Sequence, residues 1–259
     1  MSKCSREHCM LRLEHVTVTL GKGTPLERKV LNGLNVQVKE GEFLVVVGSN
    51  GAGKSTLFNL ISGAITPDSG KIYILGKDVT FSTPMERSRL VSMVVQDPKA
   101  GTIAQMTIFE NMAFALKRGQ KRGLKRFFTP YRWTLCKEKC SILGIGLEHR
   151  LKEFVGNLSG GQRQGLSLLM AIAQDSSILL LDEITAALDP INSDRIMELT
   201  AKIVTQYQRT CIMITHNMAQ AIRYGDRVLV LKNGTFVKEY TAAEKSKLPP
   251  YDRAFWEFL

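Results

Sequence analysis

Residues 48–56 read Gly48, Ser49, Asn50, Gly51, Ala52, Gly53, Lys54, Ser55 and Thr56. This stretch fits the pattern G-x-x-x-x-G-K-[ST], in which glycines let backbone N–H groups turn inward around a phosphate. The apolar run Phe43–Val47 comes directly before it, and a helix predicted from Lys54 to about Ser62 follows. In this context the pattern indicates a nucleotide site, with the helix N-terminus and Lys54 on the phosphates and the Ser55 hydroxyl on Mg²⁺.

On both sides of this stretch, short apolar runs alternate with helical patterns. The runs predicted as buried strands are Phe43–Val47, Leu90–Val95, Ile178–Leu181 and Cys211–Ile214. Helical patterns lie at Ile191–Thr205 and Asn217–Arg223. Strands that alternate with helices indicate an α/β fold whose mostly parallel sheet is covered on both faces.

Other parts of the chain depart from this alternation. Further strands are expected at 11–20, Leu34–Val38 and Lys71–Leu75, and a hairpin is expected where Val228–Leu231 and Phe236–Tyr240 flank Asn233-Gly234. Between about residues 97 and 175 the pattern is helical, with helices expected at Ile108–Leu116, Tyr131–Leu143 and Gly160–Ala173. We therefore expect a helical subdomain inserted over 97–175.

An acidic pair, Asp182 and Glu183, follows the strand predicted at Ile178–Leu181. Ligands of open parallel sheets bind at the carboxyl ends of the strands, where this pair would lie. One acid can hold Mg²⁺ while its neighbour orients water for attack on a γ-phosphate. An acidic pair alone is also common at strand ends, but together with the phosphate-binding loop it predicts a nucleotide hydrolase.

The segment Leu158-Ser159-Gly160-Gly161-Gln162 opens a predicted helix 23 residues before Asp182. With the phosphate-binding loop, it resembles the signature of the nucleotide-binding subunits of ATP-binding cassette (ABC) transporters. The resemblance covers residues 10–245 and leaves an N-terminal tail at 1–9 and an aromatic C-terminal tail at 246–259. It implies a P-loop NTPase core, a small antiparallel β subdomain and the inserted helical subdomain.

The resemblance also implies roles for single residues in binding and hydrolysing ATP with Mg²⁺. Glu183, Gln96, His216 and Lys54 match the catalytic positions, and Ser55, Gln96 and Asp182 match the metal-binding positions. In this family two cassettes enclose two ATP molecules, so a second copy of the chain is expected to present its signature to the bound nucleotide. The residues expected to contact nucleotide besides the loop are Leu20, Ser159, Gly160, Gly161, Gln162 and Asp189.

Three positions depart from the family pattern. Leu20 stands where an adenine-stacking aromatic ring is usual, and no Phe, Tyr or Trp occurs between residues 1 and 42. Ile184 replaces a common proline, and Ala186 replaces a frequent serine. None of these changes removes a catalytic group, so hydrolysis is still expected, while ATP binding is expected to be weaker.

Composition limits the cellular setting. The chain has 259 residues, is 44% hydrophobic and carries a net charge of +11, which suggests anionic partners. No apolar run approaches the roughly 18 residues of a membrane helix, and the first residues have no apolar leader. The five cysteines form no CxxC pair, and buried thiols are a better interpretation of Cys136 and Cys140 than a metal site with His149. We expect a cytoplasmic chain, peripheral on the inner face of the cell membrane.

The resemblance favours a transport function. Separate cassettes are typical of importers. The segments at 23–43, 96–115 and 185–190 resemble those of bacterial amino-acid importers of the tryptophan/tyrosine type, which are related to branched-chain amino-acid importers. An integral-membrane permease and a solute-binding protein are then the expected partners. The alternatives are an exporter cassette, a non-hydrolysing nucleotide switch and a soluble ATPase of DNA repair or chromosomes.

The basic run at 117–132 bears on these alternatives, because it holds seven Lys or Arg residues and no acid. Interleaved with Phe127, Phe128 and Tyr131, it could bind nucleic acid, an anionic membrane surface or a permease, or it could be a solvated loop. Nucleic acid is the least expected of these partners.

Overall fold

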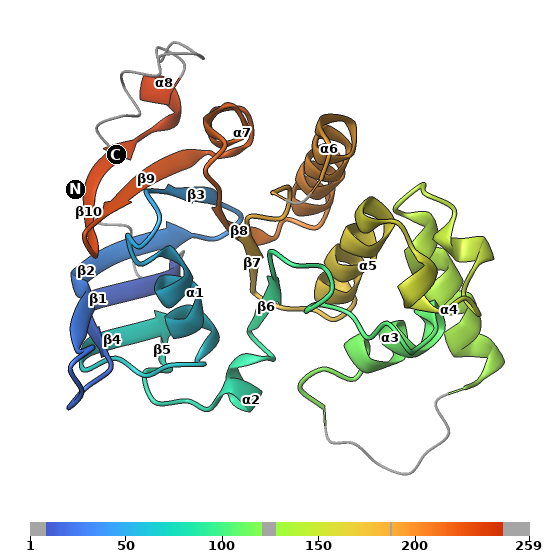
Figure 1. Ribbon diagram of the computed structural model, residues 1–259, viewed down its shortest axis with the longest axis horizontal. Helices are drawn as coiled ribbons and strands as arrows, with labels where there is room; N and C mark the ends of the chain where they lie inside the picture. The colour runs from blue at the N-terminus through green and yellow to red at the C-terminus, as the bar shows by residue number, and fades with distance from the viewer. Residues whose placement is uncertain (1–8, 121–127, 187, 246–259) are drawn as a thin grey trace.

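The computed structural model describes residues 9–120, 128–186 and 188–245 (Figure 1). The expected tails therefore fall outside the described residues, apart from Cys9, as does the middle of the basic run. No helix in the described part of the chain is long and apolar enough to cross a membrane.

A six-stranded sheet forms the centre, in the order β10-β9-β3-β8-β7-β6. Its strands are parallel except β10, which pairs antiparallel with β9. Both faces are covered, so alternate residues of one strand serve two cores: Leu44 and Val46 face one, Val45 and Val47 the other. The strand bounds are β3 Phe43–Val47, β6 Val91–Val94, β7 Ile178–Asp182, β8 Thr210–Ile214, β9 Arg227–Lys232 and β10 Thr235–Tyr240.

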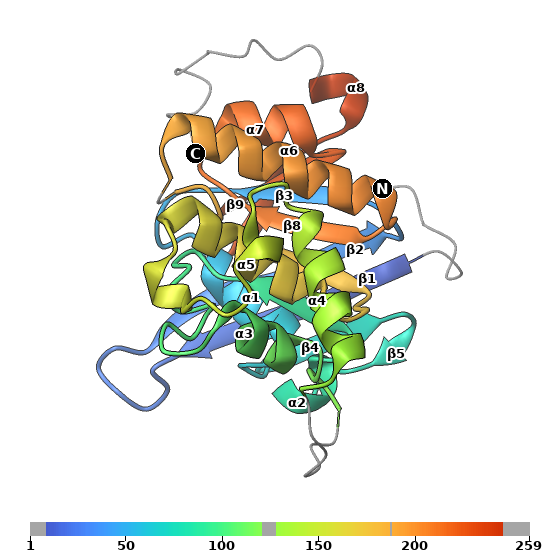
Figure 2. The ribbon, with the colours of Figure 1, turned by 90° about the vertical axis from the view of Figure 1, so that its right-hand side faces the viewer.

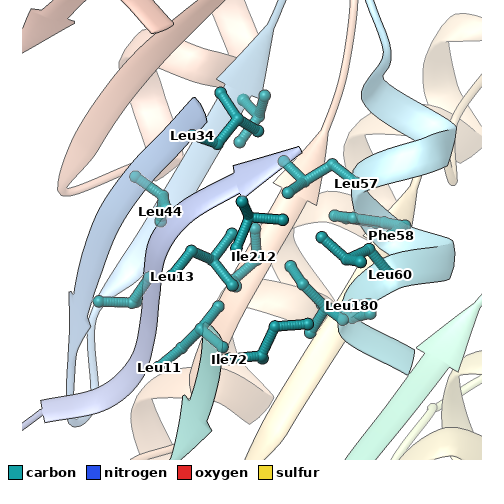
Figure 3. Packing of buried hydrophobic residues seen from close by; sticks show 14 of the residues in the cluster. Leu11, Leu13, Leu34, Leu44, Leu57, Phe58, Leu60, Ile72, Leu180 and Ile212 are labelled. Carbon is teal, nitrogen blue, oxygen red and sulfur yellow. The ribbon is translucent and has the colours of Figure 1, made fainter. Parts of the chain in front are cut away.

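A second, antiparallel sheet has the order β2-β1-β4-β5. Helix α1 packs between this sheet and the parallel strands, and Figure 3 shows its Leu57, Phe58 and Leu60 pointing into the shared core with Leu180 and Ile212. The bounds are β1 Cys9–Leu20, β2 Arg28–Lys39, β4 Ser69–Ile74, β5 Lys77–Asp78 and α1 Lys54–Ser62.

The opposite face of the parallel sheet is covered by α6 (Pro190–Gln206) and α7 (Met218–Tyr224), which lie side by side above it in Figure 2. Three shorter elements complete this part of the chain: α2 (Pro84–Arg87), α8 (Ala242–Lys245) and the two-residue edge strand β5. The sequence patterns did not predict these three, since each is too short to show a period.

The remaining helices gather away from the antiparallel sheet (Figure 1). They are α3 (Ile108–Ala115), α4 (Pro130–Ser141) and α5 (Gly160–Ile172), with the short 3-10 turns η2 (Leu147–His149) and η3 (Val155–Asn157). They share a separate apolar core. The predicted fold class, an α/β core with an antiparallel β subdomain and a helical insertion, is confirmed.

Cys136 and Cys140 belong to that helical core rather than to a metal site. Both are fully buried, and burial raises the pKa of their thiols to about 11 and about 12. His149 lies outside the core beside Glu148, and no cluster of metal ligands occurs among the described residues. The interpretation as buried thiols is the one that the structure supports.

Arg87 joins the antiparallel sheet to the end of α1. Its side chain is 1% exposed, and its guanidinium donates to the carbonyl oxygens of Leu60 and Ile61, both at 2.9 Å, and to those of Val79 and Thr80. Burial lowers its pKa to about 10, opposed by the charge of nearby Asp78. A cation at this place also complements the C-terminal end of the α1 dipole.

We expect Arg87→Met to lower the free energy of unfolding by about 2–4 kcal/mol, because it leaves buried carbonyl groups without donors. Urea unfolding followed by circular dichroism measures the change. The matched control is Lys77→Met, an exposed cation on β5, which should cost within about 0.5 kcal/mol. Equal stability of the two variants would contradict a structural role for Arg87.

Candidate functional site

The loop at residues 48–56 connects the carboxyl end of β3 to the N-terminus of α1. Gly53 caps α1 with a φ of 106°, which non-glycine residues rarely adopt. A Cβ atom at this position would lie 2.8 Å from Leu31 Cδ2 and 3.0 Å from the Val30 oxygen. The glycine therefore lets the loop close against β2.

Lys54 already lies in the curve of this loop. Its Nζ donates to the carbonyl oxygens of Gly48 at 2.7 Å and Ser49 at 3.1 Å, and the residue is 7% exposed. The ammonium group is thus held where the phosphates of a nucleotide would pass. Its charge also acts on Asp182. Burial and the charge of Glu183 raise the pKa of Asp182, and the charge of Lys54 reduces this rise.

A cleft of about 590 Å³ opens in front of the loop and collects residues from distant parts of the sequence. Its lining residues are Arg28, Val30, Asn50, Gly51, Gly53, Lys54, Ser55, Thr56, Gln96, Glu183 and His216. Of the predicted loop residues, Gly48, Ser49 and Ala52 do not line the cleft. The cleft thus joins the phosphate-binding loop to three of the predicted catalytic side chains.

These three side chains meet because β6, β7 and β8 are neighbouring parallel strands, and each side chain follows the carboxyl end of its strand. Gln96 Nε2 donates to Glu183 Oε2 at 3.1 Å, and His216 Nδ1 lies 3.3 Å from the same oxygen. Glu183 has a φ of 44°, a left-handed conformation that turns the chain sharply after β7. The carboxylate is therefore positioned by two neighbours and faces the loop.

The predicted signature residues lie outside this cleft. Ser159 caps α5: its Oγ accepts from the Gln162 backbone N at 3.3 Å, while the Gln162 side chain accepts from the Ser159 N–H at 3.2 Å. Gly160 and Gly161 occupy the first turn of the same helix. No signature residue lines the cleft of its own chain, and Ser159 and Gly160 at this helix N-terminus are exposed.

Asp189 and Leu20 also lie outside the lining. The Asp189 carboxylate caps α6 by accepting from the Asn192 backbone at 3.1 Å and from its amide at 2.6 Å, which lowers the Asp189 pKa. Leu20 is 40% exposed at the end of β1, where its register partner on β2 is Arg28.

Two features of the site carried no sequence signal. Arg28 and Val30 line the cleft from β2, although neither belongs to a recognisable motif. Gln220 of α7 is 5% exposed; its amide accepts from Thr185 Oγ1 at 3.1 Å and donates to Ser193 Oγ at 3.0 Å. This network links the segment after Glu183 to both α6 and α7, and only the folded chain reveals it.

Comparisons with known proteins agree with this geometry. The family model described as ABC transporter matches residues 31–186. A tyrosine transport ATP-binding protein of Clostridioides difficile is 38% identical over 239 residues, 92% of this chain and 95% of that protein. The carnitine transport ATP-binding protein OpuCA of Listeria monocytogenes is 32% identical over 93% of this chain, which spans 57% of OpuCA.

Solved structures of cassettes are similar over nearly the whole chain. A dimeric post-hydrolysis state of the ATP-binding cassette MJ0796, bound to ADP and Pi, has a TM-score of 0.77 at 28% identity, over 90% of this chain and 99% of that one. The ADP conformation of the cassette MJ1267 has a TM-score of 0.79 at 25% identity, over 96% and 97%. This chain belongs to the ABC transporter family, as a cassette that binds and hydrolyses ATP.

Proposed function

We propose that this chain powers an importer of amino acids or similar small solutes, acting as a dimer of two copies on a separate integral-membrane permease. The observation that carries the proposal is the division of the expected ATP site, because the cleft holds the loop and Glu183 while the signature at Ser159 is exposed and does not line it. A similar cassette, MJ0796, is described as dimeric. The amino-acid cargo rests on similarity to a tyrosine transport protein.

The proposed cassette covers residues 10–245, with a helical subdomain over about 97–175. Within it, Glu183 takes the proton of the attacking water, Gln96 and His216 hold its carboxylate in place, and Lys54 balances the β and γ phosphates. Gln96 and His216 both contact the Glu183 carboxylate, which supports this positioning role.

The residues proposed to hold Mg²⁺ are Ser55, Gln96 and Asp182. Their hydroxyl, amide and carboxylate oxygens are the hard ligands that Mg²⁺ prefers. Burial and the charge of Glu183 raise the pKa of Asp182, and a divalent cation bound there would offset the repulsion within this acidic pair. Bound there, Mg²⁺ would neutralise charge on the nucleotide phosphates.

A second copy completes the site in this proposal. That copy presents a second anion-binding surface opposite the loop, at the N-terminus of its α5. The surface consists of the Ser159 hydroxyl, the N–H groups of Gly160 and Gly161, and Gln162. Asp189 caps α6 and is exposed, and Asn192 in the first turn of that helix lies beside Gly161. Asp189 is therefore proposed to lie at the dimer interface.

The described part of the basic run favours a permease or membrane surface over nucleic acid. Arg118 is used internally, since its guanidinium donates to the Ala171 oxygen at 2.9 Å and the Gln174 oxygen at 3.4 Å. Phe128 packs on Phe109 of α3, with ring centroids 4.9 Å apart. A side chain bound to the protein in this way is less free to stack on bases.

We propose a peripheral position on the cytoplasmic face of the cell membrane, with a solute-binding protein acting through the permease.

We expect Glu183→Gln to reduce phosphate release at least 100-fold while ATP still binds, because the general base is lost and the phosphate loop is unchanged. Phosphate release and calorimetric binding of ATP are measured on the same preparation. Glu138→Gln, an exposed glutamate of α4, is the control and should keep wild-type activity. Equal rates for Glu183→Gln and the wild type would overturn the assignment of the base.

A mixing experiment tests the shared site. Lys54→Ala and Ser159→Arg should each be inactive alone, since each homodimer then lacks one half of both sites. Equal mixtures should recover about a quarter of wild-type activity, because half of the dimers are mixed and each mixed dimer keeps one intact site. No recovery, or a specific activity of the wild type that is independent of concentration, would contradict the dimer.

Affinity purification of the tagged chain from its native membranes tests the transport function. A polytopic membrane protein in stoichiometric amount is the expected companion, and its identity would point to the cargo. Soluble proteins or nucleic acid as the only companions would favour the non-transport alternative. A salt titration would then distinguish nucleic acid from soluble proteins as the companion, because a run of clustered cations binds nucleic acid with strong salt dependence.

A further inference from the structure

The cleft has two chemically different ends. Gln96, Glu183 and His216, the polar groups proposed to act on the γ-phosphate, contact one another at the carboxyl ends of β6, β7 and β8. Arg28 and Val30 line the cleft from β2 of the antiparallel sheet, where Val30 lies against Gly53 of the loop. A nucleotide whose phosphates fill the loop with the γ-phosphate at the catalytic end must direct its ribose and base toward Arg28.

Arg28 is an unusual residue for that wall. It is exposed, and among the described residues its guanidinium has no hydrogen bond or ion pair. By contrast, Arg12 of the same antiparallel sheet pairs with Glu14 and stacks over Tyr73, 4.3 Å from the ring centroid. An uncommitted guanidinium that lines a ligand cleft is available to bind what enters.

The register of β1 and β2 places an apolar group beside this guanidinium. Leu20 and Arg28 are direct partners in the antiparallel pair, and residues that face each other in this way project to the same side of the sheet, with Cβ atoms about 5 Å apart. Leu20 is 40% exposed at that end of the strand. The two side chains therefore form one small surface, apolar on one half and planar and cationic on the other.

We propose that Arg28 is the base-binding residue of this site, with its guanidinium plane stacked on the nucleotide base and Leu20 packed against the base edge. This inference rests on the proposed placement of the phosphates in the loop. Arginine stacks on aromatic faces through its delocalised plane, and a π face is common to all bases. The site consequently accepts adenine and guanine nucleotides with similar affinity, since neither Leu20 nor a stacked plane reads the polar edge of the base.

Calorimetry tests the proposal without turnover. It measures the binding of ADP, GDP and pyrophosphate, each with Mg²⁺, in about 0.15 M salt. Arg28→Ala should weaken ADP and GDP about five- to tenfold, as expected for loss of one stacking contact, and pyrophosphate less than about twofold. The wild type should bind ADP and GDP within about threefold of each other. Lys29→Ala removes an adjacent exposed cation and should leave all three affinities unchanged.

Arg28→Trp separates stacking from charge. A ring at this position should restore ADP binding to within about twofold of the wild type, since it offers a π face without a charge. If Arg28→Ala and Arg28→Trp each weakened the binding of pyrophosphate as much as the binding of ADP, Arg28 would be a phosphate contact. The proposal would then be wrong. Unchanged ADP binding in Arg28→Ala would also overturn it, while circular dichroism checks that each variant is folded.

Failure of the underlying assignment has a different signature. If the wild-type chain bound neither ADP nor pyrophosphate, the nucleotide site itself would be misplaced. If all variants bound pyrophosphate normally and ADP affinity did not depend on Arg28, the site would stand and only the inference on the base would fall.

Discussion

Backbone contact between the phosphate-binding loop and the turn of the β9–β10 hairpin is the constraint on which the rest of the structure depends. Gly234 N donates to the Ala52 oxygen at 3.1 Å, and Gly234 O accepts from Asn32 N of β2 at 2.9 Å. A Cβ atom at Gly234 would lie 2.2 Å from the Val30 oxygen, so only glycine allows this approach. One turn thus fixes the loop against the antiparallel sheet and sets the distance between the loop and the Arg28 wall.

The same constraint explains why the catalytic end of the cleft is polar yet ordered. The parallel sheet brings Gln96, Glu183 and His216 to one edge, and the fixed loop keeps Lys54 opposite them. Burial and repulsion from the neighbouring Glu183 raise the pKa of Asp182, and the charge of Lys54 offsets part of that rise. The site is therefore prepared for an anion at the loop and a cation at the acids, as phosphoryl transfer requires.

Much of this arrangement could be predicted from the sequence, for physical reasons that differ from element to element. Helix α1 was predicted with its observed bounds because an apolar stripe is enclosed by glycine caps, and Asn233-Gly234 fixed the hairpin. The predicted strand Leu34–Val38 was too short, since β2 begins with the exposed Arg28 and Lys29, which show no alternation. Arg28 enters the cleft only through antiparallel register, which no local pattern encodes.

The hydrogen bonds of Gln220 offer a physical link between the proposed dimer interface and the proposed hydrolysis of ATP in the cleft. Its buried amide uses both ends, on Thr185 and Ser193, and leaving either end unpaired would cost about 1–3 kcal/mol. The start of α6, where Asp189 is proposed to meet a second copy, is therefore hydrogen-bonded to α7. Helix α7 begins at Met218, two residues after His216, whose ring lies 3.3 Å from the Glu183 carboxylate, so a shift at the proposed interface would displace a group that holds this carboxylate. In the proposed dimer, contact between the two copies would therefore be coupled to hydrolysis through side-chain hydrogen bonds, and the rigid sheet need not deform.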